Sequence, residues 1–320
     1  MAVRFLILFL LSLFWSHAVI ADSDFIERPD VKKFIMQMVQ KHHFIQSELT
    51  DIFSTVQMRP AVIKSVKTPL EQKPWYTYQM LFVTEWRIRQ GVEFWNTYKD
   101  ALERAEKEYG VPASIIVATI GVETKYGKNT GSYRVIDALS NLAFSDSTRA
   151  PFFRQELEEF LLLVREQHLD PLKVMGSYAG AIGQPQFMPS SYRRYAVNFS
   201  GNSKIDLSNN EIDVIGSIAN YYKKHGWKTQ QPIAFKTDFA NKKNELQNNA
   251  IVNPADFGIP SLRNEKSKLI ELEGYFGREY WLSFHNFDVI KRYNPSNLYA
   301  MAVYQLSYYI SRLKGKTDNA

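Results

Sequence analysis

The segment from Val111 to Gly127 restricts the fold more than any other part of the chain, because it is apolar nearly throughout. It has a proline in its first turn and continues through small and β-branched residues. Such a segment predicts a helix that is buried among other elements. Ile116, Ile120 and Glu123 are spaced by four and then three residues, so the only carboxylate of the segment shares a face with core residues near the helix C-terminus.

A carboxylate in this position needs a chemical explanation. Burial disfavours the charged form of a carboxyl group and raises its pKa, and the negative end of the helix dipole acts in the same direction. Glu123 could therefore carry a proton at neutral pH, as a general acid must. The alternative is a structural contact with Lys125, an arginine or a backbone amide. The spacing alone leaves both interpretations open.

A second segment, Gly176 to Tyr192, is rich in glycine, proline, amides and aromatic side chains. Its glycines allow other groups to approach the backbone closely, and two prolines enclose Gln186, Phe187 and Met188. A phosphate loop is the alternative, but the segment lacks the Gly-Lys-Ser/Thr ending and the Gly-x-Gly-x-x-Gly spacing. Aromatic side chains beside amides favour a sugar-binding groove, although any one aromatic is more often part of a core.

The composition excludes several classes of protein. With 45% hydrophobic and 22% charged residues in a chain of 320, it is neither disordered, collagenous nor a polytopic membrane protein. It has no cysteine, which excludes disulfides, thiolate metal sites and cysteine nucleophiles. No Gly-x-Ser-x-Gly motif and no histidine pair with metal-ligand spacing is present, which argues against a serine hydrolase and a zinc enzyme. The net charge of +6 comes from scattered lysines and arginines, so we expect no nucleic-acid partner.

The N-terminus has the three parts of a secretory signal peptide: Arg4, an apolar run from Phe5 to Trp15, and small residues up to Ala21. The apolar run is shorter than the roughly 20 residues that a membrane-spanning helix needs. We therefore expect export with cleavage near Ala21, an uncleaved anchor helix being the alternative.

Hydrophobic spacing predicts a mainly helical chain with a smaller strand-rich part. We expect two packed helices between residues 29 and 57, followed by a proline-bracketed connection over residues 67–74. Further helices are predicted over residues 92–109, 112–126, 152–168, 189–196, 212–225 and 297–313. Short β-favouring runs predict strands at residues 233–235, 269–272 and 280–284.

Three separated motifs together resemble one family, the B-type membrane-bound lytic murein transglycosylases, which cleave peptidoglycan. The motifs are Ile120 to Gly127, Gly176 to Tyr192 and Arg292 to Val303, in that order along the chain. The resemblance extends from about residue 30 to the C-terminal helix. It implies a mainly α fold of the α+β class with a lysozyme-like helical core. The implied parts are a signal peptide at 1–21, an N-terminal helical region and linker at 22–74, the catalytic core at 75–227, a small strand-rich insertion at 228–289 and a C-terminal helix completing the core at 290–320.

In that family the glutamate of the Gly-Val-Glu-Thr motif is the single catalytic acid and base, and the resemblance implies this role for Glu123. It would protonate the oxygen between N-acetylmuramic acid and N-acetylglucosamine, then accept the proton of the muramic C6 hydroxyl as that oxygen attacks C1 and forms a 1,6-anhydro product. Because the substrate supplies the nucleophile, no second carboxylate is required. The motif match also implies substrate contacts by Ser177, Gln186, Tyr221, Tyr293, Asn294 and Tyr299, and, from weaker matches, by Arg149 and Tyr78.

Two segments depart from the family pattern. Gly183-Gln184-Pro185-Gln186 has a proline where relatives have a glycine, which alters the expected shape of the loop near Gln186. The segment from Asn198 to Asp213 aligns with an EF-hand-like calcium loop of some relatives, but asparagines stand where acids would be and Ser203 replaces the turn glycine. We therefore expect a surface turn without calcium, and no metal or cofactor elsewhere.

The resemblance leaves three functions open: a lytic transglycosylase, a muramidase in which the same glutamate activates water, and a catalytically inactive cell-wall-binding protein. The expected partners are peptidoglycan glycan strands, with cell-wall synthesis or remodelling proteins as further candidates, and the chain is expected to be a monomer. Named members of the family are anchored to the outer membrane through a lipidated cysteine at the signal cleavage site. Because this chain has no cysteine, we expect a soluble periplasmic protein.

Overall fold

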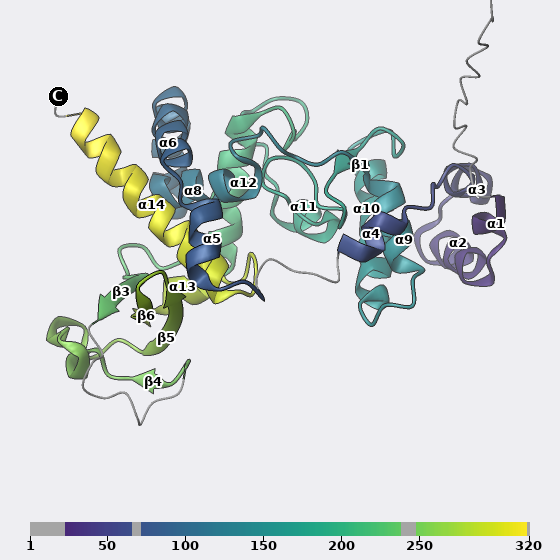
Figure 1. Ribbon diagram of the computed structural model, residues 1–320. Helices are drawn as coiled ribbons and strands as arrows, with labels where there is room; N and C mark the ends of the chain where they lie inside the picture. Colours follow the sequence, from purple (N-terminus) through teal and green to yellow (C-terminus); the bar gives the residue numbers. More distant parts are fainter. Residues whose placement is uncertain (1–22, 66–71, 238–247, 319–320) are drawn as a thin grey trace, which may run out of the picture. The chain divides into compact units, whose positions relative to one another are not determined.

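The structure is a computed structural model that describes residues 23–65, 72–237 and 248–318. It is mainly helical with a small antiparallel sheet, which confirms the predicted fold class (Figure 1). The chain divides into two compact units, residues 1–58 and 59–320. The predicted signal peptide lies outside the described residues. Among the described helices, none has both the length and the apolar character needed to cross a membrane.

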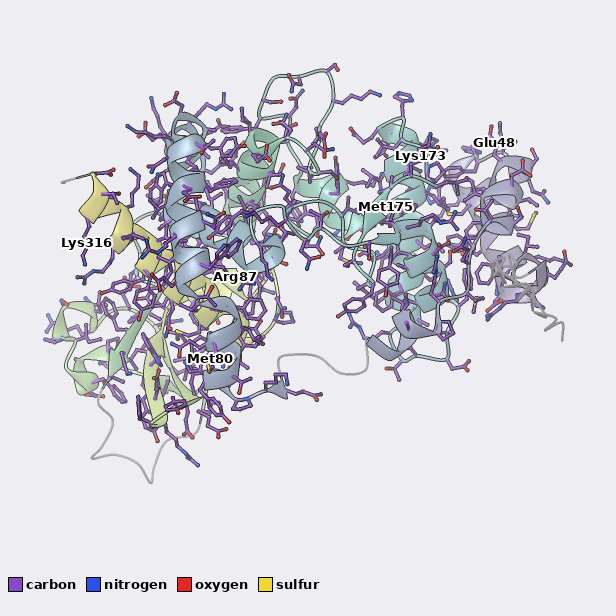
Figure 2. The ribbon with its side chains drawn as sticks, turned by 45° about the horizontal axis from the view of Figure 1, so that its top comes forward. Glu48, Met80, Arg87, Lys173, Met175 and Lys316 are labelled. Carbon is purple, nitrogen blue, oxygen red and sulfur yellow. The ribbon has the colours of Figure 1, made fainter. Side chains whose placement is uncertain are left out.

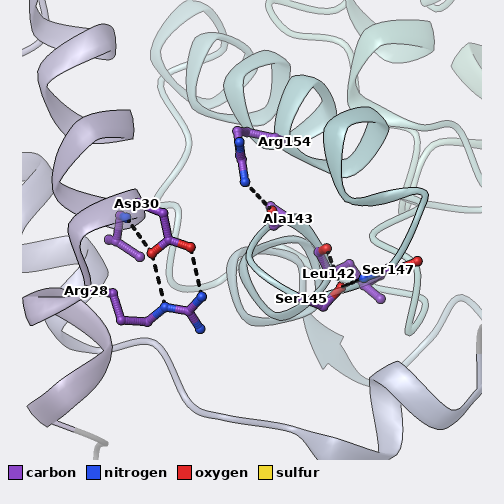
Figure 3. Close-up of polar contacts among 8 residues, drawn as sticks. Arg28, Asp30, Leu142, Ala143, Ser145, Ser147 and Arg154 are labelled. Atoms are coloured by element: carbon purple, nitrogen blue, oxygen red, sulfur yellow. Dashed lines mark hydrogen bonds and ion pairs between the residues drawn. The ribbon is translucent and has the colours of Figure 1, made fainter.

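The smaller unit contains the two helices that were predicted between residues 29 and 57. Its elements are α1 Ser23–Glu27, α2 Pro29–His42 and α3 Gln46–Ser54. Phe34 of α2 packs edge-on against Phe53 of α3, with ring centroids 5.9 Å apart. At the start of α2, Arg28 donates two hydrogen bonds to the carboxylate of Asp30 (Figure 3), and this acid lies at the positive end of the helix dipole.

The larger unit is built from helices, a small sheet and one short pair of strands. Its helices are α4 Pro60–Ser65, α5 Trp75–Phe82, α6 Glu85–Thr97, α7 Lys99–Tyr109, α8 Ala113–Thr124, α9 Val135–Ala143, α10 Ala150–Glu166, α11 Pro189–Tyr195, α12 Glu211–Lys224, α13 His285–Ile290 and α14 Asn297–Thr317. The predictions for residues 112–126, 152–168, 189–196, 212–225 and 297–313 are confirmed as α8, α10, α11, α12 and α14.

The helix predicted over residues 92–109 is in the structure two helices, α6 and α7. α6 begins earlier, at Glu85, because the side chain of Thr84 caps its first turn. Tyr98 ends α6 with φ −111° and ψ 29°, and its ring packs against Phe94 at 4.7 Å. Neither proline nor glycine marks this break, so the hydrophobic spacing could not show it.

Four helices of the larger unit were not predicted. All nine residues of α9 are buried, so the segment has no exposed face. Its sequence therefore lacks the alternation of apolar and polar residues from which a helix is predicted. Arg154 of α10 donates a hydrogen bond to the carbonyl of Ala143 at the end of α9 (Figure 3). The other three, α4, α5 and α13, have six to eight residues and are too short for a clear repeat.

α8 is the buried helix that the sequence predicted, and α6, α7, α12 and α14 pack around it. Figure 1 shows α8 beside α6 and α14. Thr119 of α8 shares a hydrogen bond of 2.8 Å with the hydroxyl of Tyr222 of α12, and both side chains are fully buried. Burial of a polar pair is tolerated because each group satisfies the other. This arrangement fixes the helix that carries Glu123.

The predicted strand-rich segment is confirmed. β3 Ala234–Thr237, β4 Ile251–Val252, β5 Ser267–Gly274 and β6 Gly277–Ser283 form one antiparallel sheet in the order β3-β6-β5-β4. Leu269 of β5 pairs with Leu282 of β6, and both belong to a small apolar core with Tyr280 and Phe284. α5 packs against β5, which places the sheet beside a helix that also reaches the candidate site. The exact bounds of the predicted domains stay predictions.

Candidate active site

Glu123 lies on the last turn of α8, and it is one of only two residues of this helix that are not buried. The chain turns sharply after it: Lys125 and Tyr126 have φ values of 53° and 58°, in the left-handed region that non-glycine residues rarely adopt. This strained turn ends the helix one residue beyond Glu123. The carboxylate is therefore held at a fixed helix end while the backbone leaves it accessible.

A cavity of about 490 Å³ lies over Glu123. Its wall combines aromatic rings, amides, hydroxyls and two cationic side chains. The lining residues are Tyr78, Phe82, Arg87, Val122, Glu123, Lys125, Asn129, Gly131, Ser132, Tyr133, Ser177, Tyr178, Gln186, Asn294 and Tyr299. Glu123 is the only carboxylate among them, so any acid–base chemistry by a carboxyl group in this cavity falls to it.

Tyr299 binds Glu123 directly. Its hydroxyl donates a hydrogen bond of 2.6 Å to Oε1 of Glu123 across 176 positions of sequence. Ser296 caps α14 by accepting hydrogen bonds from the backbone N–H groups of Leu298 and Tyr299, which fixes the first turn of the helix and with it the tyrosine. A hydrogen bond to the charged form favours the carboxylate, so Tyr299 both orients Glu123 and stabilises its ionised state.

Three further tyrosines form a cluster that packs against Tyr299, directly or through Tyr293. The Tyr293 ring is stacked on that of Tyr299, with centroids 6.2 Å apart and planes at 14°. Tyr221 and Tyr222 pack against Tyr293 at 4.7 and 5.7 Å. The hydroxyls of Tyr221 and Tyr293 donate to the carbonyls of Arg292 and Pro185, each at 2.6 Å. The cluster therefore connects α12, α14 and the glycine-rich segment around the carboxylate.

Burial raises the pKa of all four tyrosines, and the negative charge of Glu123 raises it further. The hydroxyl of Tyr299 therefore stays protonated and remains a donor over the working range of pH.

We expect these tyrosines to resist ionisation as long as the protein is folded. Their folded pKa values lie above the unfolded value of about 10, so the stabilisation is present below pH 10 and is lost as the pH rises beyond it. Absorbance titration of the 18 tyrosines should show a late group that ionises together with loss of helical circular dichroism. A single titration step in a protein that stays folded would contradict this.

The glycine-rich segment forms part of the cavity wall. β1 Tyr133–Arg134 pairs with β2 Met175–Gly176, and the loop that follows β2 presents Ser177 and Gln186 to the cavity. The hydroxyl of Ser177 accepts from the N–H of Ala181 at 3.1 Å, and the amide of Gln186 donates to Thr130 O and Gly183 O at 3.0 and 2.9 Å. These bonds hold the loop in one conformation.

Gly131 and Gly176 allow the two strands to approach this closely. A Cβ on Gly131, which has a φ of 99°, would collide with the carbonyl of Gly176. Pro185 lies between Gly183 and Gln186, which have positive φ values of 70° and 51°. Gln186, the residue after Pro185, lines the cavity.

Arg87 of α6 (Figure 2) forms hydrogen bonds to two helices that carry site residues. Its Nε donates to the carbonyl of Gly121 on α8 at 3.0 Å, and its Nη1 donates to the carbonyl of Leu81 near the end of α5. The hydroxyl of Tyr126 donates to the backbone carbonyl of Arg87 at 2.7 Å. A cation at the C-terminal ends of two helices is favoured by their dipoles. The hydrogen bond from Arg87 of α6 therefore stabilises the end of α8 that carries Glu123.

This fold and site match known proteins. The chain matches the family described as Transglycosylase SLT domain over residues 27–308. It belongs to that family. It is also 40% identical over 310 residues to membrane-bound lytic murein transglycosylase B of Escherichia coli, covering 88% of this chain and 83% of the relative.

Two solved structures share the fold of this SLT transglycosylase. Soluble lytic transglycosylase SltB1 of Pseudomonas aeruginosa is 44% identical, with a TM-score of 0.83 over 90% of this chain and 100% of that one. The lytic transglycosylase Slt35 of E. coli in complex with calcium is 38% identical, with a TM-score of 0.84 over 91% of this chain and 96% of that one. The predicted family and its lysozyme-like fold class are confirmed, and the chain is a lytic murein transglycosylase.

The cavity of the transglycosylase brings together most of the site residues predicted from the sequence. Glu123, Tyr78, Ser177, Gln186, Asn294 and Tyr299 all line it. Tyr221 and Tyr293 lie behind this wall, with their hydroxyls engaged by backbone carbonyls. Arg149 is not among the lining residues; its guanidinium lies over the rings of Phe152 and Phe153 on α10. Contacts of any of these side chains with substrate stay predictions.

Several lining residues were not predicted: Arg87, Asn129, Ser132 and Tyr133. Residues 129–133 follow the Glu123 motif within ten positions, so the polar run after Gly127 could have indicated them. Nothing in the sequence indicated Arg87, because its place in the wall depends on how α6 packs against α8.

The segment from Asn198 to Asp213, where no calcium is expected, is held by hydrogen bonds among its own residues. The carboxylate of Asp213 is fully buried and accepts hydrogen bonds from the N–H groups of Ser200 at 2.7 Å and Asp206 at 3.0 Å. The amide of Asn198 donates to the carbonyl of Asn202. Over residues 23–65, 72–237 and 248–318, no three His, Cys, Asp or Glu side chains are grouped as metal ligands. The acids of the loop thus accept hydrogen bonds from backbone amides, and the absence of calcium stays a prediction.

Tyr299→Phe should lower kcat of the transglycosylase by about 10-fold to 100-fold, because a hydrogen bond to a charged group contributes roughly 1.5–3 kcal/mol. Loss of the donor also removes a stabilisation of the carboxylate, so the alkaline limb of the pH–rate profile should move to higher pH. Tyr304→Phe is the matched control, because this hydroxyl on the same helix binds the carbonyl of Ala234 instead. An unchanged pH profile in Tyr299→Phe would show that the contact does not act on Glu123.

Proposed function

We propose that this transglycosylase cleaves the β-1,4 bond between N-acetylmuramic acid and N-acetylglucosamine in peptidoglycan, with Glu123 as the single general acid and base. The observation that carries the proposal is the lone carboxylate in the cavity, held by Tyr299 at 2.6 Å. Ordinary glycosidases use two carboxylates, one of them to activate water or to attack the sugar. A cavity with one carboxylate fits a reaction whose nucleophile belongs to the substrate.

The proposed reaction has two proton transfers through one group. Glu123, protonated, donates its proton to the glycosidic oxygen as the C1–O bond breaks and the N-acetylglucosamine hydroxyl leaves. The C6 hydroxyl of the muramic sugar then attacks C1, and the carboxylate of Glu123 accepts its proton. The product carries a 1,6-anhydro ring, and Glu123 ends in its starting state. Tyr299, as a neutral donor, holds the carboxylate in position during the second transfer.

The roles of the other lining residues follow from their chemistry. Ser177, Gln186 and Asn294 offer hydroxyl and amide groups to the sugar hydroxyl and acetamido groups, and Tyr78 offers a ring face.

Tyr221 and Tyr293 act indirectly, by supporting Tyr299 and the loop at Pro185. Arg149 would contact the substrate only outside the cavity described here, beyond the glycan that occupies it.

Mass analysis of the fragments released from purified peptidoglycan separates this function from its two alternatives. Anhydro-muramic ends, lighter by one water than reducing ends, are the expected result. Reducing ends would identify a muramidase, and the absence of any release would identify an inactive cell-wall-binding protein.

The chain is proposed to act in the periplasm after export, as a soluble monomer without a bound metal. Support comes from the signal-like N-terminus, the absence of a cysteine that could be lipidated, and the loop at Asp213, which is satisfied by backbone amides. N-terminal sequencing of the exported protein should begin near Asp22, and light scattering should give the mass of one chain. A melting temperature that rises on addition of calcium would contradict the metal-free state.

A further inference from the structure

The turn between β5 and β6 carries two aromatic side chains that the fold does not use. Tyr275 is 73% exposed and Phe276 is 99% exposed, the highest value of any large hydrophobic side chain among the described residues. They stand between Gly274 and Gly277, which pair at the end of the hairpin. Two-residue turns of hairpins favour small polar pairs such as Asn-Gly. Because the aromatic pair contributes little to packing, its presence needs another explanation.

A hollow beside this turn extends the aromatic surface onto α5. It has a volume of about 810 Å³ and is lined by Tyr76, Glu271, Glu273, Gly274, Tyr275, Gly277 and Arg278. The rings of Tyr76 and Tyr275 meet edge-on at 6.3 Å, and those of Tyr275 and Phe276 at 4.9 Å. Arg278 forms an ion pair of 2.6 Å with Glu271 at its floor. We call the turn and this hollow together the hairpin surface.

We propose that the hairpin surface binds a second stretch of the peptidoglycan glycan strand, outside the cleavage cavity. The proposal rests on the proposed function. Aromatic rings offer apolar faces to sugar rings, while the carboxylates of Glu271 and Glu273 and the guanidinium of Arg278 can bind hydroxyl and acetamido groups. The side chains that the fold leaves exposed are thus those that sugar recognition needs.

Position and charge favour the glycan over other occupants. α5 carries Tyr78 of the cleavage cavity and, two residues earlier on another side of the helix, Tyr76 of the hollow, so both sites adjoin one helix of eight residues. The hollow has two carboxylates and one guanidinium, which disfavours an anionic membrane surface. The hydroxyl and acetamido groups of the sugar rings are neutral, so their binding meets no such penalty.

The test replaces the aromatic pair by small polar residues, Tyr275→Ser with Phe276→Asn, which suit a turn in which neither position has a positive φ. Glu123→Gln in the same chain keeps the strands uncut during co-sedimentation with insoluble peptidoglycan. Loss of two aromatic contacts should raise the Kd by at least about fivefold. The control is Tyr308→Ala with Tyr309→Ala, an exposed edge-on pair on α14, which should leave the Kd unchanged.

With Glu123 intact, the turn variant should keep the kcat/KM of the parent on short soluble glycan fragments that fill only the cavity, and lose at least about fivefold on long strands. Unchanged sedimentation, or equal losses on short and long substrates, would overturn the proposal. Binding to phosphatidylglycerol vesicles that the turn variant loses, with sedimentation unchanged, would assign the surface to a membrane and also overturn it. Because sedimentation measures binding alone, it tests the hairpin surface even if the released fragments contradict the proposed reaction.

Discussion

Glu123→Gln should reduce turnover of peptidoglycan by about 10³-fold or more while leaving the melting temperature close to that of the parent. Glutamine keeps the volume of the side chain and can still accept the hydrogen bond from Tyr299, but it cannot donate or accept the catalytic proton. The loss is large because one group serves both proton transfers and the cavity holds no second carboxylate that could replace it. Release of soluble fragments from labelled peptidoglycan measures it.

Glu106→Gln, on α7, provides the control, because Glu106 contacts the opposite end of the helix that carries Glu123. Its carboxylate accepts a hydrogen bond of 3.0 Å from the N–H of Ala113 at the start of α8, and glutamine can keep that bond. This variant should retain most of the parent's activity. If Glu123→Gln retained more than a tenth of the activity, another group would have to carry the proton, and the assignment of Glu123 would be wrong.

Asp213→Asn should destabilise the larger unit by about 3 kcal/mol and lower its melting temperature by several degrees. The carboxylate is fully buried and accepts hydrogen bonds from Ser200 and Asp206, and the amide of Asn210 lies 3.3 Å from it. An asparagine would turn a donor toward one of these N–H groups and leave it unsatisfied. Differential scanning calorimetry of the variant and the parent measures the effect.

Asp206→Asn is the matched control in the same loop. Its carboxylate accepts from the N–H groups of Ser208 and Asn209, but it is only half-buried, so water can replace the lost acceptor. A cost of about 1 kcal/mol or less is expected. Two results would contradict the view that Asp213 stabilises the loop only by accepting backbone hydrogen bonds. One is an equal loss of stability in both variants, and the other is a loss in Asp213→Asn that calcium restores.

The sequence sufficed to predict the elements whose pattern is local. α8 could be identified because its apolar residues form an unbroken run with one acid at its end, and β3, β5 and β6 because their short β-favouring runs are bounded by polar stretches. α9 gave no pattern because every residue of it is buried. The break between α6 and α7 at Tyr98 could not be predicted, because the sequence has no proline or glycine there. The ring of Tyr98 instead packs against Phe94.

The geometry of the site could not be predicted in the same way. The motif match placed Tyr299 in the groove, but its hydrogen bond to Glu123 depends on how α14 packs against α8. The place of Arg87 in the cavity wall also depends on how helices pack, since its partners Gly121 and Leu81 lie on two other helices. For Arg149 the motif match did not show that the side chain at the N-cap of α10 lies over Phe152 and Phe153, away from the cavity lining.

Digestion of peptidoglycan in heavy-oxygen water tests the central claim most directly, because it asks which oxygen attacks C1 of the muramic sugar. If the C6 hydroxyl is the nucleophile and Glu123 moves its proton, the new muramic ends contain no solvent oxygen. One heavy oxygen at each new end would show that water is the nucleophile and would contradict the account.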